Sequence, residues 1–110
     1  MKRLNIGMEI EVPRGTEAPM IDGQPMSVGD LLVRIVPVVQ SGSDYMRAMN
    51  LGLEIDKALG AGEEAIDLRT DDVQTLRKVC IDMNQHHVWG ANWAKWNLNR
   101  AFDAAEEVEA

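Results

Sequence analysis

The sequence has a single cysteine, Cys80, and no long hydrophobic run. One cysteine excludes a disulfide within the chain, so the composition does not require an oxidising compartment. The longest apolar stretch, residues 31–39, is interrupted by an arginine and a proline, and it falls short of the ~20 residues of a membrane-spanning helix. Near the N-terminus, apolar residues alternate with polar ones such as Glu9 and Glu11, so this segment lacks the continuous apolar region of a signal peptide. We therefore expect a protein of the cytoplasm with no membrane partner.

Basic residues are scarce: 11 lysines and arginines stand against 18 acids, which gives a formal net charge of −7. This charge argues against nucleic acid as a partner, because a phosphate backbone would repel the protein. The acids are concentrated in residues 44–72 and in the tail from Asp103 onward. An acidic surface favours solubility. It would also suit a basic partner or a mimic of nucleic acid.

Residues with the spacing of a catalytic or metal site are also lacking. His86 and His87 lie near Cys80, but there is no second cysteine and no HxxxH pair, so no metal site is predicted. The two histidines are expected to be exposed in a turn. Asp71 and Asp72 are explained by the positive end of a helix dipole. We therefore predict no catalytic residue, no cofactor and no enzymatic activity.

What the chain does have is enough apolar sequence for one folded domain. Its 110 residues are 45% hydrophobic, which suffices to bury a core without disulfides or metal. Apolar and polar residues alternate over residues 4–12, which predicts a strand that Pro13 ends. Asp22-Gly23 predicts a turn, either within a small hairpin or at the end of a strand. Residues 65–68 are expected to be extended and to pair with the N-terminal strand.

Helical periodicity and capping residues predict the other elements. Ser27 begins a helix that Pro37 ends, although the β-branched residues of 31–39 leave a strand as the alternative. Asp44 is expected to cap a helix over 45–59, with an apolar stripe that includes Met46, Met49, Leu53 and Ile55, and with Gly60 just beyond its end. Thr70 is expected to cap a helix over 71–84, and a last helix covers 91–107. The prediction is a single α+β domain, residues 1–110, in which a small N-terminal β element is packed by three to four helices.

Aromatic residues are few, yet four of the five lie in the last 22 positions. At about 100° per residue they do not share one face of a helix. One side carries the set Trp89, Trp93, Trp96 and Arg100. The other side carries smaller apolar residues and the phenylalanine, namely Ala91, Ala94, Leu98, Phe102 and Ala105. A helix that ends a small domain needs only one apolar side to dock onto its own core.

The tryptophan side has two interpretations. Trp89 could lie outside the helix while the other two tryptophans cover the bottom of the core, with Asn92 and Asn97 as partners for the indole N–H groups. Alternatively they form a protein interface, in which Arg100 extends the aromatic set. We predict the second: an intermolecular contact through Trp89, Trp93, Trp96 and Arg100, either with a protein partner or by self-association, while the Leu98 side faces the core.

Part of the sequence resembles a known group of viral proteins. The resemblance lies in Asp22-Gly23-Gln24-Pro25, in the helix that ends with residues 54–60, and in residues 64–68 leading to 71–73 and 76–79. Over residues 20–80 the chain resembles a family of small uncharacterised tailed-bacteriophage and prophage proteins. It departs from that pattern at 28–30, where Val-Gly-Asp replaces Thr-Leu-Gly, and no catalytic residue comes with the resemblance.

The resemblance implies a phage or prophage origin. Together with the tryptophan side, it leads us to expect a non-enzymatic protein-binding module, either a virion component or a virion-assembly component. The protein would then be found in the host cytoplasm or in the virion. The alternative is a small acidic inhibitor of a host protein, whose acidic surface would carry the recognition.

Overall fold

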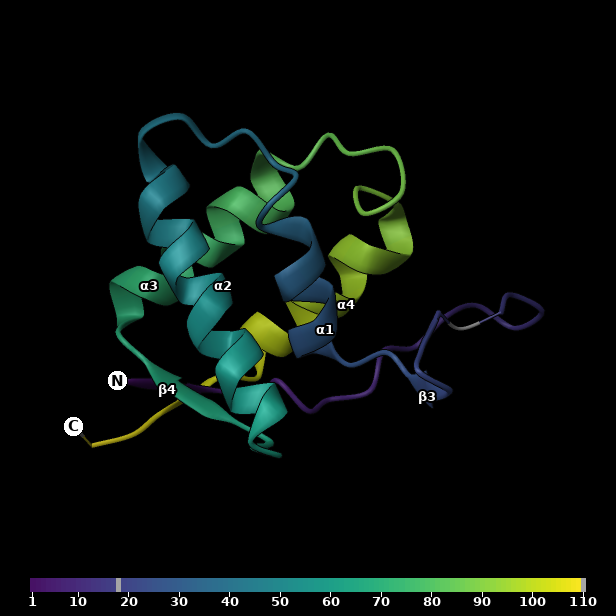
Figure 1. The fold of residues 1–110 in the computed structure, drawn as a ribbon, viewed down its shortest axis with the longest axis horizontal. Coiled ribbons are helices and arrows are strands. Elements are labelled where there is room, and N and C mark those ends of the chain that lie inside the picture. The colour runs from purple at the N-terminus through teal and green to yellow at the C-terminus, as the bar shows by residue number, and fades with distance from the viewer. Residues whose placement is uncertain (18, 110) are drawn as a thin grey trace.

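The computed structural model describes residues 1–17 and 19–109, which contain four α-helices and two small sheets (Figure 1). In chain order the elements are β1 (Lys2–Leu4), β2 (Met20–Ile21), β3 (Gln24–Pro25), α1 (Val28–Ile35), a 3₁₀ turn (Gly42–Asp44), α2 (Tyr45–Gly60), β4 (Ile66–Leu68), α3 (Thr70–Arg77), a π-helical turn (Lys78–Asp82), α4 (Asn92–Asp103) and β5 (Glu106–Glu107). The predicted helix-dominated α+β fold is confirmed.

The main sheet is antiparallel and has β1 at its centre, between β4 and β5. The pairing of β4 with β1 was predicted and is confirmed; Arg3 faces Asp67, and the two side chains form an ion pair at 2.9 Å. This guanidinium lowers the pKa of Asp67 below its usual value, mainly through the side-chain hydrogen bond. The sheet brings the two ends of the chain side by side (Figure 1).

The predicted N-terminal strand over 4–12 is mostly extended chain without a ladder. Regular pairing stops at Leu4 because β4 begins at Ile66, which is Leu4's partner in the register. The alternation nevertheless holds, since Leu4, Ile6 and Ile10 are buried. Beyond the ladder, backbone bonds to other segments hold the chain: Gly7 N–H donates to the carbonyl of Glu64 at 2.9 Å. The alternation therefore predicted correctly which residues are buried, but it did not predict how long the strand is.

Helix α1 docks its first turn directly onto this extended segment. Ser27 and Asp30 form the capping box, and the helix ends before Pro37, so the helical alternative for this region is confirmed. Gly29 N–H donates to the carbonyl of Ile6 at 2.8 Å. A Cβ on Gly29 would lie 2.9 Å from both that oxygen and the Ile6 Cβ, so the close approach requires glycine.

The predicted helix over 45–59 is confirmed as α2, but the residues at its two ends differ from prediction. Asp44 does not cap it, because a 3₁₀ turn leads into the helix and the Asp44 carboxylate pairs with Lys78 at 2.9 Å. Gly60 is still helical, and Gly62, at φ +79°, takes the left-handed position instead.

The predicted helix over 71–84 corresponds to α3 and the π-helical turn that continues it to Asp82. Its apolar stripe is buried at Val73, Leu76 and Cys80, whereas Met83, at the end of the π turn, is half-buried. Thr70 is the first helical residue rather than the cap, and it makes no capping hydrogen bond. The π turn closes with Met83 N–H donating to the carbonyl of Lys78 at 2.9 Å.

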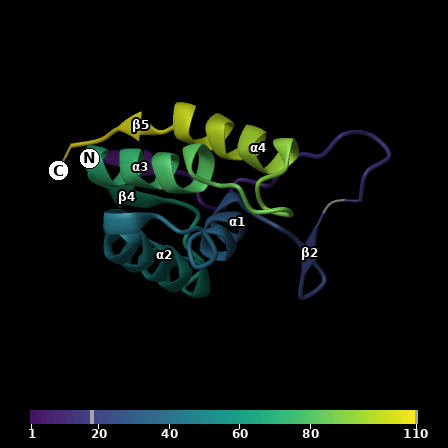
Figure 2. The ribbon, with the colours of Figure 1, turned by 90° about the horizontal axis from the view of Figure 1, so that it is seen from above.

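Helix α4 completes a ring of four helices around the core. It packs against α1 and α3, while α2 packs against the same two helices from the other side (Figure 2). Its predicted core side is confirmed, since Ala94, Leu98 and Phe102 are buried. The predicted extent to 107 is wrong: α4 ends at Asp103, because the chain then extends to pair with β1 as β5.

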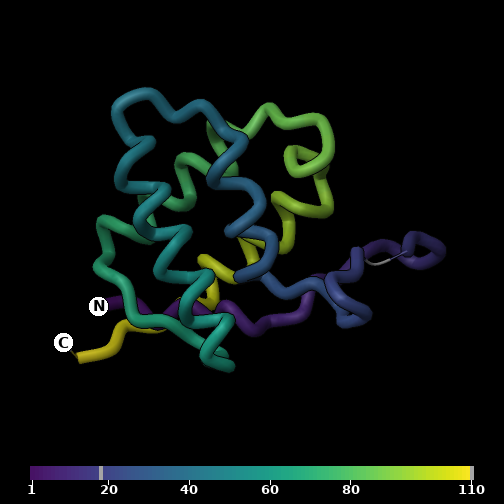
Figure 3. The backbone as a smooth tube through the Cα atoms, viewed as in Figure 1, coloured from purple at the N-terminus to yellow at the C-terminus, as the bar shows by residue number. Residues whose placement is uncertain are grey.

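An arm projects from this body, formed by the described residues 14–17 and 19–25 (Figure 3). The predicted hairpin is confirmed there, with Ile21 paired to Gln24 across Asp22 and Gly23, both at positive φ. Positive φ at both turn residues matches the twist of a tight hairpin. Pro13, just before this arm in the sequence, lines a groove together with the N-terminal part of α4.

Candidate binding groove beside the tryptophans

The three tryptophans do not form one uniform face. Trp89 lies in the turn before α4, and its ring meets the Trp93 ring edge-on, with the centroids 6.3 Å apart. Both rings are half-buried and pack against the core. Trp96, one turn further along, leaves 53% of its surface exposed. Trp89 and Trp93 are therefore anchored at the edge of the core, and Trp96 is the tryptophan whose ring is exposed at the surface.

A buried asparagine ties the N-terminal segment to α4 beside these rings. The Asn97 amide is fully buried; its Nδ2 donates to the carbonyl of Glu11, and its Oδ1 accepts from the Glu11 N–H, both at 2.8 Å. Nδ2 also donates to the carbonyl of Trp93 at 2.7 Å. Asn97 was interpreted as a possible partner for a tryptophan indole, whereas it pairs with backbone instead. Its amide completes the hydrogen bonding of one residue of extended chain.

Arg100 fixes the same segment from the next turn of α4. Its Nη2 donates to the carbonyl of Glu9 at 3.0 Å, and its Nη1 pairs with the Glu11 carboxylate at 2.7 Å. The guanidinium also lies over the Trp96 ring, 5.1 Å from the centroid. Arg100 is thus engaged within the molecule, and it acts on the surface by holding Trp96 and residues 9–11 in place.

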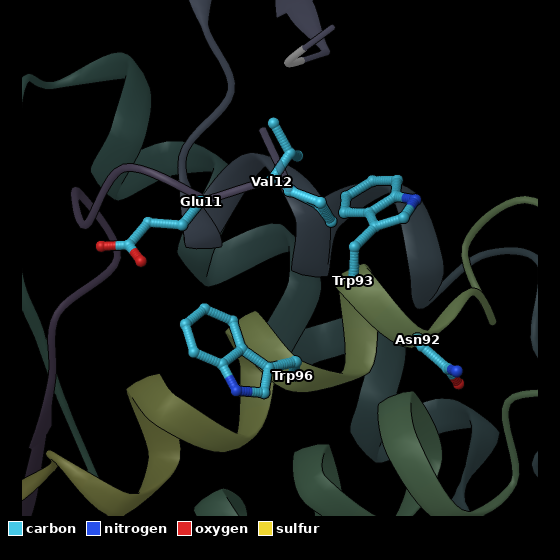
Figure 4. Close-up of a pocket in the computed structure, with 6 residues that line it drawn as sticks. Glu11, Val12, Asn92, Trp93 and Trp96 are labelled. Atoms are coloured by element: carbon cyan, nitrogen blue, oxygen red, sulfur yellow. The ribbon is translucent and has the colours of Figure 1, made fainter. Parts of the chain in front are cut away.

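These contacts frame an open groove with a volume of about 410 Å³. One wall is the extended chain of Glu11, Val12 and Pro13, and the other is formed by α4 residues Asn92, Trp93 and Trp96. In Figure 4 the Val12 side chain and the two indole rings face the groove, while the Glu11 carboxylate and the Asn92 amide point away on opposite sides. The volume lies within the usual range for ligand clefts, and the lining is aromatic and aliphatic.

The turn that leads into α4 is built by side chains that the sequence did not identify. Asn84 is fully buried, and its amide bonds the carbonyls of Cys80 and Trp89. His86 was predicted to be exposed together with His87, and this is wrong: it is half-buried, and its Nδ1 accepts from the N–H groups of Val88 and Trp89 at 3.2 Å. This polar turn positions Trp89 under Trp93.

The remaining candidates for chemistry have structural roles. Asp72 is buried and paired with Arg47, while Asp71 is exposed at the start of α3. Burial raises the pKa of the Cys80 thiol to about 12, so this cysteine stays protonated and unreactive. Within residues 1–17 and 19–109, no three histidine, cysteine or acidic side chains gather as metal ligands would.

A second apolar surface was missed because its residues were expected in the core. Met46, Met49 and Leu53 have the helical spacing of a buried stripe, yet they are 62%, 37% and 54% exposed. Helix α2 buries the opposite side instead, through Ala48, Leu51 and Ile55. The sequence holds only part of the signal: the small residues at 48 and 52 mark a side of α2 that can approach another helix closely, but the neighbour that Gly52 fits against, Val36, is fixed by the tertiary fold.

The chain matches no family model, no curated protein and no solved structure. Among the described residues, no helix has the length and apolar character needed to cross a bilayer.

Proposed function

We propose that this protein is a non-enzymatic protein-binding module whose groove beside Trp93 and Trp96 receives apolar side chains of a protein partner. The observation that carries the proposal is the exposed Trp96 ring, held under the Arg100 guanidinium. A large aromatic that is already fixed loses little conformational entropy on binding, which is the property of an interface anchor. Trp93 and Val12 supply the apolar floor and wall.

The groove favours protein over nucleic acid. Single-stranded nucleic acid also stacks on tryptophan, but it needs free cations along its backbone path. Here the Arg100 charge is already neutralised by Glu11, and Glu9 lies exposed beside it. The net charge of −7 adds long-range repulsion against phosphates.

The proposed biological setting is a bacteriophage particle or its assembly. It is supported by the resemblance of residues 20–80 to small phage proteins, which covers α1 to α3 but not the groove. In this setting the partner is another virion protein, and the protein should co-purify with particles.

A second candidate function is an acidic inhibitor of a host protein. It is favoured by exposed acids at the end of α2 and in the loop that follows, namely Glu54, Asp56, Glu63 and Glu64, which form no ion pair within the described residues. Expression early in infection, together with absence from purified particles, would favour this candidate over the virion role.

The experiment compares Trp96→Ala with Val88→Ala, an exposed apolar residue (48%) in the turn before α4. Trp96→Ala should lower the free energy of unfolding by only about 1 kcal/mol, because more than half of the ring is exposed and it is not part of the buried core. It should nevertheless abolish retention of the protein on particles purified by density gradient. Val88→Ala should leave both quantities unchanged.

A third variant separates an interface from a core role. Trp93→Ala removes a half-buried ring from the core edge, and should lower the free energy of unfolding by about 2 kcal/mol. If Trp96→Ala lowers it as much as Trp93→Ala does, or if it binds particles like the parent protein, Trp96 is not the anchor of an interface.

A further inference from the structure

Helix α2 has two apolar sides, and the fold covers only one of them. Ala48, Leu51 and Ile55 face the core, whereas Met46, Met49 and Leu53 face outward. The three outward residues lie at positions i, i+3 and i+7, which places them on one continuous strip of the helix. This strip lies on the α2 side of the molecule and involves none of the residues that line the tryptophan groove.

A notch borders the strip where α1 meets α2. It has a volume of about 70 Å³ and is lined by Val33, Val36 and Pro37 from the α1 side and by Met49, Gly52, Leu53 and Asp56 from α2. Gly52 creates it, because a Cβ there would stand 3.3 Å from a Val36 methyl and would fill the space between the helices. The notch is large enough for the end of one aliphatic side chain, such as a methionine.

We propose that this strip is a self-association surface, covered by the same strip of a second copy with the two α2 helices antiparallel. A two-fold axis between positions 49 and 50 brings Met46 of each copy opposite Leu53 of the other copy. In this register the flexible Met46 side chain reaches the notch beside the partner's Gly52. Each copy thus offers both a ridge and a notch, as an isologous interface requires.

The charges on α2 favour this arrangement over a parallel one. The centre of the strip is uncharged, with Met49, Asn50 and Leu53 around the axis. Antiparallel pairing places the two Asp56 carboxylates roughly 20 Å apart, at opposite ends of the interface. Each then lies near the first turn of the other α2, where the helix dipole is positive and the Asp44 carboxylate is already paired with Lys78. A parallel pair would bring the two carboxylates together.

Sedimentation equilibrium of the full chain tests the proposal. The parent protein should be a dimer at micromolar concentrations, and Leu53→Glu should be a monomer with unchanged helix content by circular dichroism, because Leu53 is half exposed and its loss opens no core cavity. Val88→Glu, at a similarly exposed position outside the strip, should remain a dimer. A monomeric parent protein, or a Leu53→Glu variant that still dimerises, would overturn the inference.

Cross-linking tests the orientation. Cys80 is buried, so an engineered cysteine is the only thiol open to reagent. Met49→Cys lies next to the axis and should be joined to its partner by a short bismaleimide, whereas Asp56→Cys, exposed on α2 and roughly 20 Å from its counterpart in the antiparallel pair, should not. A dimer that cross-links equally at both positions contradicts the antiparallel pairing. A dimer that Trp96→Ala dissociates would place self-association in the tryptophan groove, which would refute this inference while leaving the groove as an interface.

Discussion

Individual polar side chains determine where the aromatic surface lies. Asn97, Arg100 and Asn84 each bond backbone that belongs to another segment or to a turn, and together they set the positions of residues 9–11 and of Trp89. None of them belongs to a sequence motif, and because asparagine and arginine are mostly exposed in proteins, nothing in the local sequence marks these three as structural. The clustering of tryptophans in the sequence indicated that a surface lies near α4. Only the contacts in the structure show that Trp89 and Trp93 pack against the core, whereas Trp96 is exposed.

Removing the two hydrogen bonds between the Asn97 amide and the backbone of Glu11 should lower the stability of the fold. Asn97→Leu keeps a similar volume but leaves the N–H and the carbonyl of Glu11 without partners, so we expect a loss of about 2 kcal/mol in the free energy of unfolding in urea. Hydrogen exchange at the Glu11 amide should accelerate in the same variant. An unchanged exchange rate would show that the amide is not held by Asn97.

Cys80 predicts a specific dependence of stability on alkaline pH. An unfolded cysteine ionises near pH ~8.5, whereas the buried thiol has its pKa raised to about 12. Above pH ~8.5 the unfolded state releases a proton that the native state keeps. The stability that the buried, protonated Cys80 thiol contributes is therefore fully present below pH ~8.5, and it is lost as the pH rises toward the native pKa.

By about pH 10, the ionisation of Cys80 in the unfolded state should have lowered the free energy of unfolding by about 2 kcal/mol relative to neutral pH. Urea unfolding of the parent protein and of Cys80→Ala measures it, because the other titrating groups are common to both. The variant should be less stable at neutral pH because of the small cavity, but its stability should decline less with pH. Parallel pH profiles for the two proteins would contradict the assignment.

Helices and strands were predictable wherever the local pattern agreed with the final packing. The helix start at Ser27, the turn at Asp22-Gly23 and the helix that follows Thr70 all depend on neighbours in sequence, and all were confirmed. The failures occurred where distant segments decide. Strand β5 replaces the predicted end of the last helix because β1 has a free edge at its side, and Lys78 takes the Asp44 carboxylate away from the α2 terminus.

The candidate surfaces were predictable only in part, for the same reason. Clustering of tryptophans near the C-terminus is visible in the sequence, but the opposite groove wall comes from residues 11–13, about eighty positions away. The strip of Met46, Met49 and Leu53 looks like core because its spacing is right. Which side of α2 faces inward depends on Gly52 fitting against Val36, a contact between two helices.

At the scale of the whole molecule, we propose different occupants for two apolar surfaces formed by the described residues. The groove beside α4 is formed by fixed aromatic residues, which suits a protein partner that docks on a prepared site. The strip on α2 is formed by flexible side chains around an uncharged centre, which suits a second copy of the chain. A dimer through α2 would leave both grooves open, so the protein would present two equivalent binding sites, and their binding to a repetitive partner would reinforce each other.

The central claim is that the groove beside Trp96 contacts another protein, and site-specific photo-cross-linking tests it most directly. A benzophenone side chain at Asn92, exposed on the groove rim, is compared with the same group at Gln74 on α3, in the cells that naturally produce the protein. The account predicts one discrete protein adduct from position 92, lost when Trp96→Ala is added, and none from position 74. An adduct from position 92 that survives Trp96→Ala, or the absence of any adduct there, would contradict it.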